Sequence, residues 1–269
     1  MHPILVHWGP VTLYTFGLCF AAGVLLGAWV AGRQARREAD FPLPDAAIGD
    51  LLLAVVIGGV VGGRLLYMLL NWRDYVARPW EVVALWHGGL IFYGGFAGGL
   101  LSAWWYLHRR LSAAGRWSWA AFLRVIDLLM PSLALAQSVG RLGCFFNGCC
   151  YGRPTVSGWG MTFPGVPVPL YPAQLIESLA TLILFVVLRA IQGWPWRRAP
   201  VRPGLLTALY LVLYGTARFG IEFLRGDNPR WWLGLTLSQW LGVAAVPLGF
   251  ALLLRRQKIP RSKNIRVVF

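Results

Sequence analysis

The sequence predicts an all-α, polytopic membrane protein with about seven transmembrane helices. Hydrophobic residues make up 57% of its 269 residues and charged residues 13%, and the mean hydropathy is +0.58. A soluble domain carries roughly a quarter charged residues, so this chain has too little polar surface to cover a globule in water. A helix needs about 20 mainly apolar residues to cross a bilayer, which leaves room for several spans in one membrane domain covering residues 1–269.

Seven apolar segments supply these expected spans. They are separated by polar, Gly-rich or Pro-rich stretches, and each is long enough to cross the hydrocarbon core or nearly so. In chain order the segments are Thr12–Ala31, Ala46–Leu70, Gly88–Leu107, Ala120–Gly140, Ala173–Ile191, Leu205–Phe223 and Trp231–Leu254. The residues Met1–Pro10 lack the basic region and small-residue cleavage site of a signal peptide, so we expect the first segment to stay as a helix.

Basic residues outnumber acidic ones, with 25 Lys and Arg against 10 Asp and Glu. They gather after the first, third, fifth and seventh segments. Cytoplasmic loops of membrane proteins collect Lys and Arg, so we expect the N-terminus outside and the C-terminus in the cytoplasm. No nucleic-acid-binding motif accompanies the charge, and we expect no nucleic acid partner.

The segment 151–172 follows the fourth span and would lie on the outer side. It is rich in Gly and Pro and poor in basic residues. This composition predicts a structured outer loop, in which Trp159 is a candidate anchor at the membrane interface.

Glycines recur at four-residue spacing in the second and third segments. This spacing lets helix backbones approach closely, so helix packing is the interpretation we favour. The pairs are Gly58 with Gly62, Gly59 with Gly63, Gly94 with Gly98, and Gly95 with Gly99.

Charged residues inside the apolar segments are the strongest functional signal. Each costs at least about 2.5–3.5 kcal/mol at the bilayer centre, and such residues pair with one another, face a cavity or carry chemistry. A purely structural alternative is internal ion pairing, for example of Arg64 with Asp127. The six residues are Arg64, Asp127, Arg141, Glu177, Arg218 and Glu222.

Arg218, Glu222 and Arg225 are spaced i, i+4 and i+7, which places them on one face of a helix. A guanidinium binds phosphate through two hydrogen bonds and stays ionised in a low dielectric. We therefore expect a phosphate-bearing lipid headgroup at the outer interface.

Polar and reactive residues are most concentrated in the stretch Gly140–Thr155, which holds two arginines, an asparagine and three cysteines among glycines. Irregular backbone at membrane depth is tolerated only where it is buried in protein or lines a cavity. We therefore expect a broken helix end that lines a cavity.

That stretch resembles the signature of the prolipoprotein diacylglyceryl transferases, a Gly-Arg-x-Gly run leading to Asn and Gly. Three further stretches agree with family motifs and stand in the family's order, and Arg64 fits a weaker early element. The three stretches are Trp86–Gly95, Tyr171–Glu177 and Arg218–Arg225.

The resemblance implies an enzyme of the bacterial cytoplasmic membrane that needs no cofactor or metal. Members transfer diacylglyceryl from phosphatidylglycerol to the thiol of a lipobox cysteine in the signal peptide of a prolipoprotein, and glycerol phosphate leaves. Arg141, Arg218 and Tyr93 are then the candidate catalytic residues. The candidate substrate-binding residues are Asn147, Gly152, Gln174, Glu222, Arg225, Arg64 and His87.

The chain departs from the family pattern at several positions. Tyr93 stands where well-known members have a His that is proposed as base or proton relay. A phenol with a pKa near 10 is a poor base, so we expect Tyr93 to position the headgroup, with His87 as a substitute for the base. Cys144 and Cys149 stand where many members have Asn and a carboxylate.

The cysteines leave several interpretations open. Cys144, Cys149 and Cys150 cluster in the sequence, while Cys19 is alone in the first segment. The cluster could pack as small apolar residues, form a disulfide, act as a redox pair in a membrane thiol oxidoreductase, or hold a metal, although zinc wants more ligands than three local thiols. An anionic solute transporter is a further alternative, since such proteins also use intramembrane arginines and broken helices.

Overall fold

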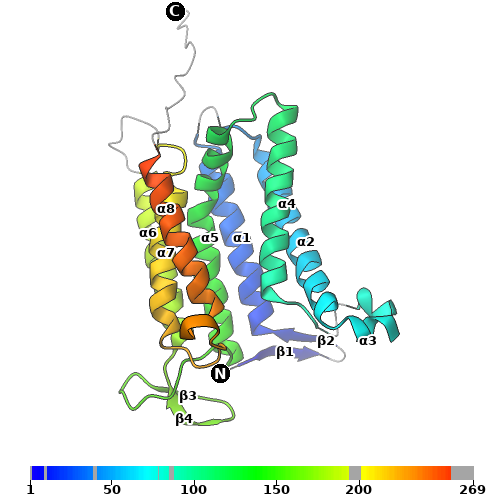
Figure 1. Ribbon diagram of the computed structural model, residues 1–269, viewed down its shortest axis with the longest axis vertical. Helices are drawn as coiled ribbons and strands as arrows, with labels where there is room; N and C mark the ends of the chain where they lie inside the picture. Colours follow the sequence, from blue (N-terminus) through cyan, green and yellow to red (C-terminus); the bar gives the residue numbers. More distant parts are fainter. Residues whose placement is uncertain are drawn as a thin grey trace, which may run out of the picture. The chain divides into compact units, whose positions relative to one another are not determined.

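The fold is taken from a computed structural model that describes residues 2–8, 11–38, 41–77, 79–84, 88–193 and 201–255. Helices dominate these ranges (Figure 1). The long ones are α1 (Thr15–Ala35), α2 (Asp45–Leu70), α4 (Phe92–Ala113), α5 (Trp119–Asn147), α6 (Ala173–Gln192), α7 (Leu205–Glu222) and α8 (Leu237–Leu254). Shorter elements are α3 (Trp72–Ala77) and the 3₁₀ turns η1 (Pro79–Val82) and η3 (Trp232–Gly234).

Five of the described helices are long and apolar enough to cross a membrane, namely α1, α2, α5, α6 and α8. The coarse prediction of a helical, multi-pass membrane protein is therefore confirmed. Of the two long helices that do not meet these limits, α7 carries Arg218 and Glu222 inside it. The count of seven spans and the orientation of the termini stay predictions, and the basic tail beyond Arg255 lies outside the described residues.

Several expected boundaries were wrong. The segment expected at Gly88–Leu107 is the helix α4, which begins at Phe92 and ends at Ala113. The first helix begins at Thr15, because residues before it form an antiparallel hairpin of β1 (Ile4–Trp8) and β2 (Val11–Tyr14). The helix expected to break at Gly140 continues to Asn147, so the irregular backbone starts only at Gly148. The last helix begins at Leu237, where Thr236 and Gln239 form a capping box, which satisfies two orphan backbone donors.

The chain divides into two compact units, of which the first comprises residues 1–31 and 123–269 and the second residues 32–122. The second unit is built on the pairing of α2 with α4. A Cβ atom at Gly62 would lie 2.3 Å from the backbone oxygen of Gly94, and one at Gly98 would lie 2.2 Å from that of Gly58. The backbones thus touch directly, and the packing interpretation of the glycine pairs is confirmed here.

In the second unit Arg64 is buried and binds backbone rather than a carboxylate. Its guanidinium donates to five carbonyl oxygens, those of Glu81, Val82, Ala84, Gly88 and Gly89.

Asp127, the suggested partner of Arg64, has partners of its own in the first unit. The Asp127 carboxylate accepts hydrogen bonds from the backbone N–H of Gly204 (2.6 Å) and of Thr207 (2.8 Å) and from the Thr207 hydroxyl. It therefore caps the N-terminus of α7, where a negative charge is stabilised by the helix dipole. Asp127 and Arg64 thus each have hydrogen-bond partners within their own unit.

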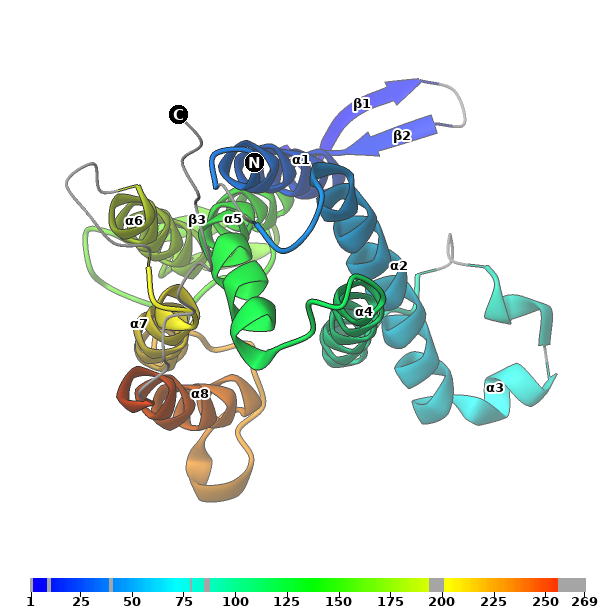
Figure 2. The same cartoon turned by 90° about the horizontal axis from the view of Figure 1, so that it is seen from above.

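In the first unit α5, α6, α7 and α8 lie side by side in both views (Figures 1 and 2). Ser138 of α5 and Ser178 of α6 each donate from the hydroxyl to the other's backbone oxygen at 2.9 Å. A hydrophobic cluster that includes Leu188 and Leu206 lies between the helices. The Ser pair fixes the register of α5 against α6, because both hydrogen bonds form only at this alignment.

The segment 151–172, expected as an outer loop, contains the antiparallel strands β3 (Met161–Phe163) and β4 (Val166–Leu170). Its two ends are joined by a backbone hydrogen bond from the Gly152 N–H to the Tyr171 oxygen (2.8 Å). The Arg153 N–H donates to the Leu224 oxygen (2.7 Å), which ties the segment to the residues that follow α7.

Candidate active site

A buried carboxylate, Glu177, is the centre of a charge network in the first unit. Its side chain is 4% exposed and receives Arg141 Nη2 at 2.9 Å on one oxygen and Arg218 Nη1 at 3.4 Å on the other. The Tyr214 hydroxyl donates to the same carboxylate at 3.3 Å. Two guanidiniums from different helices thus converge on one carboxylate, that of Glu177. The predicted contact of Arg141 and Arg218 with a lipid phosphate stays a prediction.

The local sequence explains why Arg141 and Glu177 meet. Arg141 follows Ser138 by three residues on α5, and Glu177 precedes Ser178 on α6. The reciprocal Ser138–Ser178 hydrogen bonds therefore hold the α5 arginine beside the α6 carboxylate, since residues three apart share a helix face.

Arg218 joins two carboxylates. Its Nη2 lies 2.8 Å from Glu222 one turn further along α7, and the same nitrogen donates to the Ser238 hydroxyl at 3.1 Å. Glu222 also accepts a hydrogen bond from the Asn228 side chain. With 10% of its side chain exposed, Arg218 is held in place by partners on several sides, whereas Arg141 keeps 24% of its side chain exposed.

Arg225 departs from the predicted shared face. The helix α7 ends at Glu222, so Arg225 lies in the turn beyond it and binds Asp227 through two hydrogen bonds of 2.9 and 2.6 Å. Burial acts to lower the pKa of Arg225, but the hydrogen bonds and charge of Asp227 outweigh burial and raise the pKa above its ordinary value. Arg218 and Glu222 do pair at i, i+4, so only the Arg225 part of that prediction was wrong.

Gln174 offers an unused acceptor near the network. Its amide nitrogen donates to the Cys149 backbone oxygen at 2.7 Å. Its amide oxygen is buried and has no hydrogen-bond partner among the described residues. Such an atom costs free energy unless a ligand or water satisfies it, and Gln174 sits only three residues before Glu177.

The other predicted residues of the first unit surround this network. Asn147 is the last residue of α5 and is exposed, next to the Cys149 thiol. At Gly152 a Cβ atom would lie 2.6 Å from the Tyr171 Cβ and 2.7 Å from the Leu224 oxygen, so this position accepts only glycine without a shift.

The second unit holds the remaining candidates. Tyr93 is in the first turn of α4 and is 39% exposed, and Arg64 is engaged by backbone carbonyls as described above. His87 lies outside the described residues. The roles suggested for these three residues stay predictions.

An apolar cavity of about 190 Å³ lies between α6 and α7, and Glu177 and Tyr214 are among the residues that line it. Its walls are mainly aliphatic, with Leu184, Val187 and Leu213 among them. A hydrocarbon chain fits such walls.

Neither Glu177 nor Tyr214 was predicted from the sequence as a site residue. The signal for Glu177 was present, because it is an acidic residue inside an apolar segment and ends the Tyr171–Glu177 motif. Tyr214 carried no signal of its own, since a tyrosine in an apolar helix is common at membrane interfaces.

The fold and site define a class: a multi-pass membrane protein in which buried arginines and carboxylates adjoin an apolar cavity suited to an amphiphile. The chain belongs to the prolipoprotein diacylglyceryl transferase family, whose model matches residues 3–255. Members of this family are transferases.

Curated relatives are similar in sequence to this chain over nearly its whole length. The chain is 35% identical to the phosphatidylglycerol–prolipoprotein diacylglyceryl transferase of Synechococcus elongatus, covering 92% of this chain and 84% of the relative. It is 33% identical to the protein of the same name from Parasynechococcus marenigrum, covering 97% and 98%. A third, from Pseudomonas aeruginosa, is 31% identical over 93% of this chain and 92% of the relative.

Proposed function

We propose that this protein transfers the diacylglyceryl group of phosphatidylglycerol to the lipobox cysteine thiol of prolipoproteins in the bacterial cytoplasmic membrane. The observation that carries the proposal is the convergence of Arg141 and Arg218 on Glu177, a residue that lines an apolar cavity. Family membership supports the same reaction.

In this proposal the phosphate of the lipid binds to Arg141 and Arg218 while an acyl chain enters the cavity between α6 and α7. Arg141 is the more exposed of the two, so its guanidinium can turn from Glu177 to the phosphate. Arg218 stays fixed by Glu177 and Glu222. The Gln174 amide oxygen, which has no partner among the described residues, accepts a hydrogen bond from a headgroup hydroxyl.

The reaction breaks a carbon–oxygen bond. The substrate thiol loses its proton, the thiolate attacks the glycerol carbon of the diacylglyceryl group, and glycerol phosphate departs with the electron pair. Negative charge gathers on the leaving phosphate, and a preorganised donor aimed at such charge typically contributes about 3–4 kcal/mol to the transition state. Arg141 and Arg218 are the donors in this step.

The remaining roles follow the family resemblance. Tyr93 positions the headgroup, and Asn147, Gly152, Arg225, Arg64 and His87 contribute to the substrate site. The protein crosses the membrane seven times with the N-terminus outside, which brings the prolipoprotein to the outer side with the loop 151–172.

A transfer assay tests the proposal. The full-length protein in lipid nanodiscs containing phosphatidylglycerol is given a synthetic peptide with a lipobox cysteine, and the diacylglyceryl mass gain is followed by mass spectrometry. We expect transfer by the wild type, and a loss of at least about 100-fold in rate for Arg141→Ala and for Arg218→Ala.

Arg110→Ala is the matched control, because Arg110 also pairs with a carboxylate, that of Asp50 at 3.0 Å, but both side chains are about half exposed. We expect this variant to keep the wild-type rate. Full-rate transfer by a folded Arg141→Ala or Arg218→Ala protein, judged by its elution as a single species, would remove that arginine from the mechanism.

A further inference from the structure

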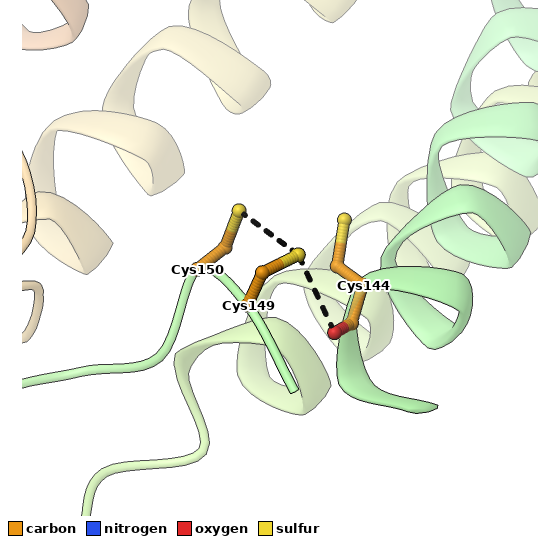
Figure 3. A group of neighbouring side chains, drawn as sticks. All are labelled: Cys144, Cys149 and Cys150. Atoms are coloured by element: carbon orange, nitrogen blue, oxygen red, sulfur yellow. Dashed lines mark hydrogen bonds between the residues drawn. The ribbon is translucent and has the colours of Figure 1, made fainter. Parts of the chain in front are cut away.

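Three thiols gather where α5 ends. Cys144 lies in the last turn of the helix, and Cys149 and Cys150 follow it directly. Their sulfur atoms all lie within 4.8 Å of one another, with Cys149 Sγ and Cys150 Sγ 3.8 Å apart. All four cysteines of the chain are free thiols, and Figure 3 shows the Cys149 sulfur between those of Cys144 and Cys150.

The spacing of the three sulfurs is that of metal ligands. A tetrahedral zinc site with Zn–S bonds of about 2.3 Å places its sulfurs about 3.8 Å apart. Thiolates are soft ligands and select thiophilic ions such as Zn²⁺ and Cu⁺. One pair already has this separation, and the others need to close by no more than about 1 Å to reach it.

The backbone turn after α5 places Cys149 and Cys150 near Cys144. The Cys149 N–H donates to the Cys144 oxygen at 3.1 Å, and Gly148 has a φ of 71°. Cys150 has a φ of 63°, a left-handed conformation that is uncommon for residues other than glycine. Such strain persists where the surroundings impose it, often at functional sites. Here Gln174 holds the neighbouring Cys149 oxygen from α6.

We infer that Cys144, Cys149 and Cys150 bind one Zn²⁺ ion as thiolates and leave its fourth coordination position open. A disulfide would use two of the thiols and leave the third without a role, whereas a metal uses all three. Binding releases the three thiol protons to solvent. Three protein ligands with one open position are the pattern of catalytic zinc sites.

The position of the cluster suggests what occupies the open position. Arg141 precedes Cys144 by three residues on α5, so the two side chains share a helix face. The charge of Arg141 also acts on Cys149, and that of Arg225 on Cys150. The metal would therefore lie near Arg141, one of the two arginines proposed to hold the lipid phosphate.

This step rests on the proposed function. The substrate thiol binds the open position as a thiolate, its proton passing to solvent, since a metal-bound thiol is deprotonated. The thiolate attacks the glycerol carbon, the carbon–oxygen bond breaks, and glycerol phosphate leaves with the electron pair. The thioether product is neutral and dissociates. Zinc would thus replace a protein base, in a chain that has Tyr93 where well-known members have His.

Metal binding is measured directly on the full-length protein in detergent. The protein is reduced, incubated with Zn²⁺ and freed of unbound metal, and its zinc content is measured by mass spectrometry of the element. We expect one zinc per chain in the wild type. Cys144→Ser, Cys149→Ser and Cys150→Ser should each lower retention at least about tenfold.

Cys19→Ser is the matched control, because Cys19 also packs against α5, at Gly143, but lies outside the three-thiol group. It should retain zinc like the wild type. Titration of the wild type with Co²⁺ gives a readout that does not depend on whether a variant folds: sulfur-to-cobalt charge-transfer bands and tetrahedral ligand-field bands should appear together.

Three results would overturn the metal site: no metal retained by the wild type, equal retention by the three Ser variants, or a disulfide between two of the three thiols in metal-free protein purified without reductant. The transfer assay on the same samples separates the two proposals. Zinc bound without any transfer by the wild type contradicts the proposed function alone. Transfer at full rate after a chelator has removed the zinc contradicts the catalytic role of the metal alone.

Discussion

Two buried arginines have their charges stabilised by different kinds of partner. Arg64 in the second unit is 6% exposed and is surrounded by backbone carbonyl oxygens, whereas Arg218 in the first unit is 9% exposed and lies between two carboxylates. Carbonyls are part of the fold and cannot be exchanged for a ligand without unfolding the segment. Carboxylates paired with a partly exposed second arginine form a set of charges that can rearrange around an anion. Arg218 is therefore better placed than Arg64 to exchange a partner for an anionic ligand.

The largest effect should come from the carboxylate-bound arginine. Arg218→Lys keeps the charge, but one ammonium cannot reach Glu177, Glu222 and Ser238 at once, because it lacks the planar fork of a guanidinium. We expect the rate of diacylglyceryl transfer to fall by about 100-fold, with the protein still folded. A lysine variant that transfers at the wild-type rate would show that charge alone is sufficient there.

The second-largest effect we expect is a loss of stability when the packing of α2 against α4 is disturbed. Gly62→Ala places a Cβ atom 2.3 Å from the Gly94 oxygen, and overpacking of this kind costs about 1–3 kcal/mol or more. Gly49→Ala in the same helix is the control, since nothing lies within 4 Å of its Cβ position, and it should be neutral or stabilising by up to about 1 kcal/mol. Thermal unfolding in detergent compares them, and equal midpoints would contradict the close contact.

Arg64→Lys should destabilise the segment that the guanidinium holds together. An ammonium offers three donors where the guanidinium meets five carbonyl oxygens, so at least two buried carbonyls lose their partner, at about 1–3 kcal/mol each. The expected result is faster proteolysis or hydrogen exchange in residues 79–91 than in α5. Unchanged protection there would mean that the carbonyl shell does not depend on Arg64.

The smallest effect belongs to the Ser pair that aligns α5 with α6. Ser138→Ala removes one of the two reciprocal hydrogen bonds to Ser178, and polar contacts of this kind between membrane helices contribute about 0.6 kcal/mol on average. Unfolding in a denaturing detergent should show a loss of that order, together with a smaller change in transfer than for Arg218→Lys. A loss above about 2 kcal/mol would mean that the pair carries more than the alignment of two helices.

Much of the fold followed from hydropathy and spacing alone. The segments at Ala46–Leu70 and Ala173–Ile191 match α2 and α6 within one residue at each end, because twenty or more apolar residues have few alternatives to a helix in a bilayer. The hairpin β1–β2 was missed, since its residues are as apolar as those of α1 and no turn signal separates them from it. The end of α5 was misplaced because glycines within a packed helix look the same in sequence as glycines that break one.

The candidate site was predicted in part. Intramembrane Arg141, Arg218 and Glu222 were identified from the cost of burying charge, and two of the three motif stretches around them contain the residues that meet. Their partners were not predictable, since a residue's neighbour across two helices depends on helix rotation and register. The place of Arg225 beyond the helix end was missed for the same reason, as a periodic pattern does not mark its last turn.

The sequence by itself determined that this chain is a helical membrane protein of the transferase family, because composition, apolar length and ordered motifs are properties of the chain rather than of its packing. Only the tertiary structure decided that Glu177 is the group on which Arg141 and Arg218 converge, that Arg64 is held by backbone carbonyls, and that three thiols share one small volume. The first two facts depend on contacts between residues distant in the chain, and the third on the backbone turn that follows α5. The bilayer, which favours many helices equally, does not specify which side chains face one another.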